Sequence, residues 1–161
     1  TEADRYLTDY SPAPKYYFGF SNMFTIRNFD LGFNLRANLG NYMFNDFAAG
    51  NSTTYNFSNQ GFLTNMVDVV NRTGFTRSNS PQQIKSDYFI EDASFIKMDN
   101  ITLGYNFNKI FKSSIAGRLA FSVQNVFVIT KYTGLDPEGW GIDNNIWPRP
   151  RIYTLGLNLT F

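Results

Sequence analysis

Two residue types that carry much of protein chemistry are missing from this sequence. Its 161 residues include no histidine and no cysteine. Nucleophilic sites that need either residue, zinc sites built from them and disulfide frameworks are therefore excluded within this chain. Adjacent carboxylates such as Glu91 and Asp92 could in principle serve glycosidic acid–base chemistry, but neighbouring strand positions point to opposite faces, which favours solvated charges. We therefore expect a protein that is not an enzyme, with no catalytic residues, no metal site and no cofactor.

Long apolar runs and charge of one sign are scarce as well. No stretch of about 18 consecutive apolar residues occurs, which excludes a transmembrane helix. The formal net charge is +1 and there is no basic tract, so nucleic acid is not an expected partner. By its length the chain forms one domain at most.

Aromatic residues, in contrast, are abundant, with 17 phenylalanines and 10 tyrosines. The mean hydropathy is nevertheless negative, a combination typical of strands with one apolar and one polar face. Residues 153–161 show this pattern most clearly, because small or polar residues separate the apolar ones. The apolar positions are Tyr153, Leu155, Leu157, Leu159 and Phe161. Since strand side chains alternate with period two, this stretch predicts an amphipathic strand of a membrane barrel or of a soluble sandwich.

Four earlier segments show the same alternation, which predicts about five strands in all. They cover residues 16–26, 29–39, 88–107 and 118–130. Runs of ten or more residues suit a tilted membrane span better than a globular strand, which averages about five or six. In the third segment the apolar positions change parity near Asp99 and Asn100, which predicts a β-bulge.

The connections alternate between short and long. We expect tight turns at residues 28–30 and 108–115, and long loops at 45–86 and 131–150. Apolar residues at helical spacing predict a short amphipathic helix at 62–74 inside the first loop. Bacterial outer-membrane barrels have short periplasmic turns and long extracellular loops. The predicted fold is therefore all-β, an antiparallel transmembrane β-barrel segment whose two long loops are extracellular.

The last loop and the strand after it hold the candidate binding residues. Five aromatic or basic residues could stack on a cargo or donate hydrogen bonds to it, and packing against a lid or neighbouring loops is the alternative. They are Tyr132, Trp140, Trp147, Arg149 and Arg151. Asp136 and Glu138 could share a metal through oxygen ligands, but turn formation around Pro137 is the favoured interpretation.

Three motifs resemble the late strands of SusC/RagA-like TonB-dependent transporters. They are the run from Tyr88 to Phe107, the stretch Ser122-Val123-Gln124-Asn125-Val126-Phe127 with the following Lys131 to Glu138, and the terminal Pro148 to Phe161. The segment from Asp4-Arg5 to Phe24 resembles an earlier part of the same barrel. The resemblance implies the last five of 22 strands, with the plug and the N-terminal strands absent from residues 1–161. It also makes the strand with Tyr153, Leu155, Leu157, Leu159 and Phe161 the barrel-closing and assembly element.

The resemblance further implies active nutrient import across the outer membrane of Bacteroidota. The cargo of such transporters is usually an oligosaccharide and less often an oligopeptide. A SusD-like surface lipoprotein would cap the barrel, and TonB with ExbB and ExbD would supply the energy. A rival interpretation is a soluble carbohydrate-binding β-sandwich with an aromatic platform, which would need a second apolar layer to cover the sheet. Another is a barrel assembled from several copies of this chain.

Overall fold

The computed structural model describes residues 5–52, 85–108, 115–144 and 147–160. The chain divides into two compact units. The strand unit comprises residues 16–38, 95–130 and 149–161, and the loop unit comprises residues 1–15, 39–94 and 131–148. The helix predicted at 62–74 and the predicted assembly residue Phe161 lie outside the described residues.

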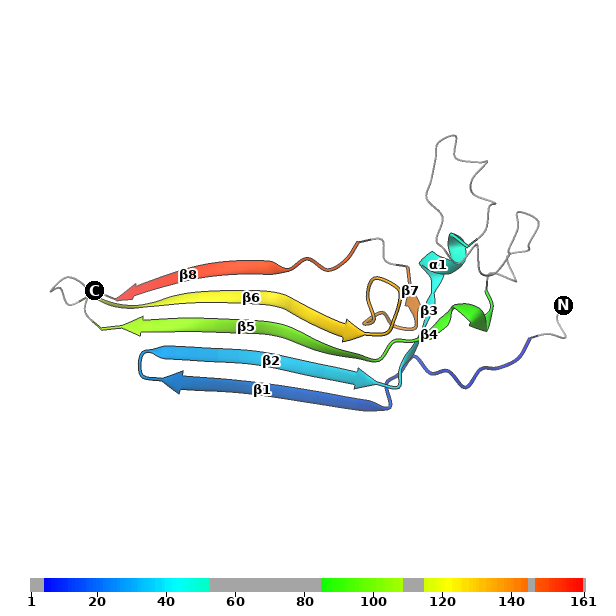
Figure 1. Cartoon of the computed structure of the whole chain (residues 1–161), viewed down its shortest axis with the longest axis horizontal. Helices are drawn as coiled ribbons and strands as arrows, with labels where there is room; N and C mark the ends of the chain where they lie inside the picture. Colours follow the sequence, from blue (N-terminus) through cyan, green and yellow to red (C-terminus); the bar gives the residue numbers. More distant parts are fainter. Residues whose placement is uncertain (1–4, 53–84, 109–114, 145–146, 161) are drawn as a thin grey trace, which may run out of the picture. The chain divides into compact units, whose positions relative to one another are not determined.

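The strand unit is a five-stranded sheet in the order β1-β2-β5-β6-β8 (Figure 1). Its strands are β1 (Tyr16–Ile26), β2 (Phe29–Leu39), β5 (Phe95–Phe107), β6 (Ala116–Thr130) and β8 (Ile152–Thr160). The pairs β2–β5, β5–β6 and β6–β8 are antiparallel. Each long strand lies beside the next long strand of the chain, which is the up-and-down order of a barrel wall. The predicted all-β antiparallel fold and its five long strands are confirmed.

The registers of these strands align their side chains in rows. One apolar row runs Leu31, Leu103, Phe121, Leu155, and the adjacent polar-face row runs Gly32, Thr102, Ser122, Thr154. Because neighbouring strand residues point to opposite faces, these rows lie on opposite sides of the sheet. The alternation in the sequence is thus a real division of the sheet into an apolar and a polar face.

The β-bulge predicted near Asp99 is present, and it extends into the next strand. Between Met98 and Asn100 of β5 one residue has no partner on β2, and on β6 the two residues Asn125 and Val126 lie opposite that position. Asn125 has a φ of 52°, a left-handed conformation that asparagine tolerates better than most residues. The extra residue restores the phase, so Met98 joins Leu35 and Phe127 on the apolar face.

The loop unit contains short elements that sequence periodicity cannot detect. A small sheet has the order β4-β3-β7, formed by Ile90–Asp92, Tyr42–Asn45 and Ile142–Asp143. Helix α1 spans Asp46–Gly50, and the 3-10 helix η3 spans Asp87–Phe89. Two small clusters form its buried centre, one around Met43 and Tyr132 and one around Ala49 and Phe89.

Two predicted boundaries are wrong. The third long strand was expected from Tyr88, but β5 begins at Phe95 because the Asp92 carboxylate accepts hydrogen bonds from the backbone N–H and hydroxyl of Ser94 and turns the chain there. The first tight turn, expected at 28–30, lies at Arg27 and Asn28. Phe29 and Asp30 already pair with β5. Within the described residues, no helix is long and apolar enough to span a bilayer.

Candidate functional site

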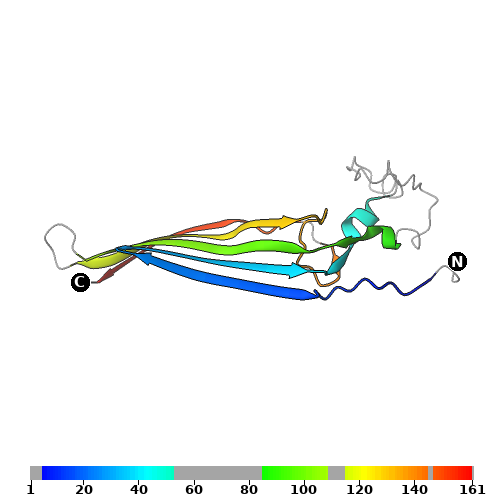
Figure 2. The same ribbon diagram turned by 60° about the horizontal axis from the view of Figure 1, so that its bottom comes forward.

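Most of the large side chains on the apolar face of the strand unit are exposed or half-exposed, and Val123 in its middle is buried. Large side chains from all five strands contribute to it, and the closing strand is exposed throughout, with Leu155 at 71% and Leu157 at 59%. At one end the rings of Phe29 and Tyr105 contact each other at 4.8 Å between centroids. No second apolar layer covers this face among the described residues, and the strands form a single layer (Figure 2). The soluble-sandwich interpretation requires a second layer that buries these side chains, and the described residues do not supply one.

The polar face carries an ion pair that spans three strands. The carboxylate of Asp30 on β2 accepts hydrogen bonds from Arg118 on β6 (3.2 Å from Nε) and from Asn106 Nδ2 on β5 (2.9 Å). Gly104 of β5 lies between the two partners. A Cβ there would lie 2.5 Å from Asp30 Oδ1 and 2.6 Å from Arg118 Nη2, so a larger residue would force the ends of these two side chains to shift. The pair connects the side chains of β2, β5 and β6 in the observed register.

A second ionic group lies beside the bulge on the same face. Arg36 donates from Nε and Nη2 to the two oxygens of Asp99, at 2.5 and 2.9 Å. Its guanidinium also lies 5.8 Å from the centre of the buried Phe95 ring. Lys97 Nζ approaches the same carboxylate at 3.9 Å, and Arg149 acts on it electrostatically. Three cations thus lie in the surroundings of the Asp99 carboxylate, a grouping that cannot be predicted from the sequence because its members are up to 113 positions apart.

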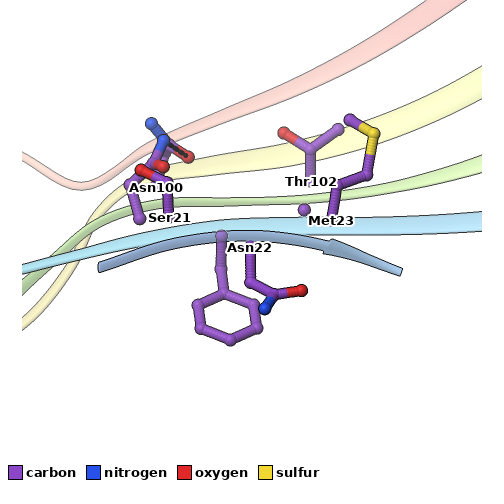
Figure 3. Close-up of a pocket in the computed structure, with 8 residues that line it drawn as sticks. Ser21, Asn22, Met23, Asn100 and Thr102 are labelled. Carbon is purple, nitrogen blue, oxygen red and sulfur yellow. Dashed lines mark hydrogen bonds between the residues drawn. The ribbon is translucent and has the colours of Figure 1, made fainter.

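A shallow depression of about 440 Å³ lies across β1, β2 and β5. Figure 3 shows Ser21, Met23, Asn100 and Thr102 on one side of the sheet and Asn22 on the other. In this depression the Asn34 amide donates a 3.0 Å hydrogen bond to Asn100 Oδ1. The polar face is therefore lined by amides, hydroxyls and paired charges, groups that suit a water-filled space.

Among the five candidate binding residues, Tyr132 is buried. It is buried beside Met43 and Ala93, and its hydroxyl donates a 3.0 Å hydrogen bond to Asp143 Oδ2. Burial, with the nearby Asp143 charge as a second cause, raises the pKa of Tyr132 well above its usual range. The hydroxyl of Tyr132 therefore stays protonated, and its hydrogen bond to Asp143 connects the two ends of the 131–143 segment. Any contact with cargo by this residue stays a prediction.

The carboxylates of Asp143 and Asp136 both accept hydrogen bonds from backbone N–H groups of this segment. Asp143 also accepts from the N–H groups of Leu135 and Asp136. Asp136 Oδ1 accepts a 3.0 Å bond from the N–H of Glu138, which is the turn geometry favoured from the sequence over metal binding. Among the described residues, no group of three or more acidic, histidine or cysteine side chains is arranged to hold a metal ion.

The other four candidate residues are exposed. Trp140 is 90% and Trp147 79% exposed, and Arg149 and Arg151 are exposed too. Trp140 sits on a short turn in which Gly141 has a φ of 84°. Arg151 Nε donates to the carbonyl oxygen of Asn125 at 3.4 Å, so its guanidinium is anchored at the bulge. Their role as cargo contacts stays a prediction.

Comparison with known proteins bears on this architecture. No protein-family model matches the chain. It is 40% identical over 166 residues to the TonB-dependent receptor SusC of Bacteroides thetaiotaomicron, and 28% identical over 183 residues to the TonB-dependent receptor P3 of Formosa agariphila. The alignments cover 98% and 99% of this chain. The chain also superposes on the solved structure of the RagAB peptide transporter with a TM-score of 0.72, at 25% identity over 96% of its length.

These relatives are much longer than the chain. The chain spans only 16% and 17% of the two curated relatives and 18% of the solved chain. All of them are named as receptors or transporters, and none as an enzyme. The similarity covers both the strand unit and the loop unit, because nearly the whole chain aligns.

Proposed function

Because this chain is a barrel segment of the SusC/RagA-like TonB-dependent transporters, we propose that it forms part of the wall and outer loops of an outer-membrane importer. One observation carries the proposal. The same five strands expose a continuous apolar face on one side and present paired charges and amides on the other. A bilayer around the barrel would cover the first face, and an aqueous lumen would hydrate the second.

The rest of the same barrel is the first partner of this segment. β1 and β8 are the two edges of the sheet, and an unpaired edge in hydrocarbon leaves each backbone group unsatisfied at a cost of several kcal/mol. Strands of the intact transporter that precede this segment would pair with both edges and close the wall. β8, with Tyr153, Leu155, Leu157 and Leu159 towards lipid, is then the closing strand.

The loop unit is proposed to face the cell exterior, at residues 45–86 and 131–150. A SusD-like lipoprotein would cap the barrel there, and the pairing in the RagAB transporter supports such a partner. TonB with ExbB and ExbD would provide the energy from the inner membrane, and a plug domain of the same transporter would gate the lumen. The similarity to the transporter family supports these partners.

The proposed cargo is an oligosaccharide, and an oligopeptide is the alternative. The higher identity to the receptor named SusC supports the first, and exposed tryptophans such as Trp140 and Trp147 can stack on sugar rings. The similarity to a peptide transporter supports the second.

Uptake by the intact transporter tests the function. Cells that carry or lack its gene are given fluorescent oligosaccharides and oligopeptides of equal length, with and without a functional TonB. We expect gene-dependent and TonB-dependent uptake of oligosaccharides. Uptake of peptides alone would move the cargo to the alternative, and uptake of neither class, or uptake that ignores TonB, would refute the proposed import.

A further inference from the structure

β8 pairs with β6 along its whole length (Figure 1), but the sequence of β8 specifies this pairing weakly. Its apolar side repeats leucine at Leu155, Leu157 and Leu159, with a small or polar residue at each position between them. A shift of β8 by two residues would keep every side chain on its face of the sheet, because strand side chains alternate with period two. The alternation therefore excludes a slip by one residue and allows a slip by two.

The connection between β6 and β8 does not set the register either. β1 and β2 are joined by a tight turn at Arg27 and Asn28, and such a turn fixes the register of the strands that it joins. The connection from β6 to β8 comprises residues 131–151, which is too long to act as a tight turn. Contacts between particular residues must therefore select the register of β8.

Such a contact lies where the ladder between the two strands stops. The last paired residues are Gln124 and Ile152. Directly beyond them, the Asn125 amide donates a 2.9 Å hydrogen bond to the carbonyl oxygen of Pro150, and Arg151 Nε donates at 3.4 Å to the carbonyl oxygen of Asn125. A side chain from each side of the strand pair thus binds the backbone of the other.

The bulge holds Asn125 at one place along β6. Its φ of 52° is left-handed, and Asn125 and Val126 share the position opposite Asp99. Bulges fix the register of the strands around them, so the Asn125 amide has a defined height on the sheet. A shift of β8 by two residues would move the Pro150 carbonyl by about 7 Å along β6, and both hydrogen bonds would break.

Proline makes the two directions of slip unequal. If Ser122 lay opposite Ile152, Pro150 would enter the ladder opposite Gln124, where it has no N–H to donate. If Ser122 lay opposite Gly156, Pro150 would move further from the ladder. The second slip is therefore the one that the contact at Asn125 has to prevent.

We propose that Asn125 and Arg151, which we call the register contact, select the register in which β8 joins β6. The inference goes beyond the proposed import, because it concerns how the wall is built and not what crosses it. The stagger of the strands is linked to the tilt and diameter of a barrel, so a slipped β8 would change the lumen. Arg151 thereby has a positioning role that requires no cargo.

Cysteine pairs on the polar face report the register directly. In the intact transporter with any native cysteines removed, Ser122→Cys is combined either with Thr154→Cys, its observed partner, or with Gly156→Cys, its partner after the slip. Directly opposite Cα atoms lie about 5 Å apart and diagonal ones about 7–8 Å, at or beyond the limit for a disulfide. With an aqueous oxidant, the first pair should cross-link roughly tenfold faster than the second.

Variants then assign the register to the contact. Asn125→Gly keeps a residue that accepts the left-handed backbone but removes the amide, so cross-linking of the slipped pair should rise several-fold while that of the observed pair falls. Arg151→Met should act in the same direction more weakly. Gln124→Gly, at an exposed neighbouring position, is the matched control and should change neither yield. Unchanged yields in Asn125→Gly would overturn the proposal.

A variant that does not assemble also gives an answer. If Asn125→Gly yields no folded barrel, the disulfide between positions 122 and 154 is formed before refolding into lipid vesicles, where it imposes the observed register without the contact. Recovery of a heat-resistant barrel would support the register role, and failure to recover it would contradict that role. Neither readout involves uptake, so a failure of the proposed import is detected separately.

Discussion

An arginine on the apolar face of β8 should destabilise the folded barrel, and the polar face of the same strand offers a matched control. Leu157 is 59% exposed and pairs with Leu119 of β6. If lipid covers this face, Leu157→Arg places a cation in hydrocarbon at about 2–4 kcal/mol near the midplane. This corresponds to a loss of roughly 30- to 1000-fold in the ratio of folded to unfolded barrel.

The control must lie on the polar face without adding repulsion. Asn158 is unsuitable because it pairs with Arg118, and a second cation there would be opposed by the first. Thr154 pairs with Ser122, so Thr154→Arg places the same charge in the polar face beside a hydroxyl. The intact transporter is refolded into lipid vesicles, and urea unfolding is followed by the heat-dependent gel mobility of the barrel. Equal midpoints for the two variants would refute the lipid assignment of this face.

Three further predictions concern the polar face and the loops. Gly104→Ala should push aside the flexible ends of Asp30 and Arg118, which the new Cβ would meet, and the weakened ion pair should cost at most about 1 kcal/mol. Gly156→Ala, with nothing within 4 Å, should leave the urea midpoint within experimental error. Tyr132→Phe removes a buried hydrogen bond and should lower the free energy of unfolding by about 1 kcal/mol at neutral pH. Because folding raises the pKa of the Tyr132 hydroxyl, its stabilising effect is complete below a pH of about 10 and is lost as the pH rises further. Limited proteolysis of the loop should show this loss at alkaline pH only when tyrosine is present. Tags in the loops at 45–86 and 131–150 should react with a membrane-impermeant reagent on intact cells that lack the lipoprotein, and reaction only after the outer membrane is opened would invert the topology.

The strands could be read from the sequence because each one is long and has two chemically distinct faces. Period-two alternation sets the faces of β2, and the register confirms them from Phe29 to Ala37. Even the irregularity at Asp99 left a trace, since the apolar positions change parity there. The elements that escaped prediction are short. β3, β4 and β7 have two to four residues each, too few to show a period.

The ionic groups could not be predicted for a different reason. Asp30 and Arg118 are separated by 88 positions, and their contact depends on the register of three strands and on the missing side chain of Gly104. Tyr132 illustrates the same limit. Its sequence position left contact with cargo and packing against a lid or neighbouring loops both open, and the hydroxyl of this buried ring binds Asp143, whose position depends on the fold of the loop unit.

The central claim, that one face of this sheet meets lipid and the other meets water, has a direct test. The segment contains no native cysteine, so single cysteines can be introduced at positions 154, 155, 157, 158 and 159 of the intact transporter and labelled with a fluorophore in lipid vesicles. Brominated lipids should quench the label at 155, 157 and 159, and iodide in the buffer should quench it at 154 and 158. If the leucine positions do not respond to brominated lipids in the assembled protein, the face assignment is wrong, and the proposal of a transporter wall fails with it.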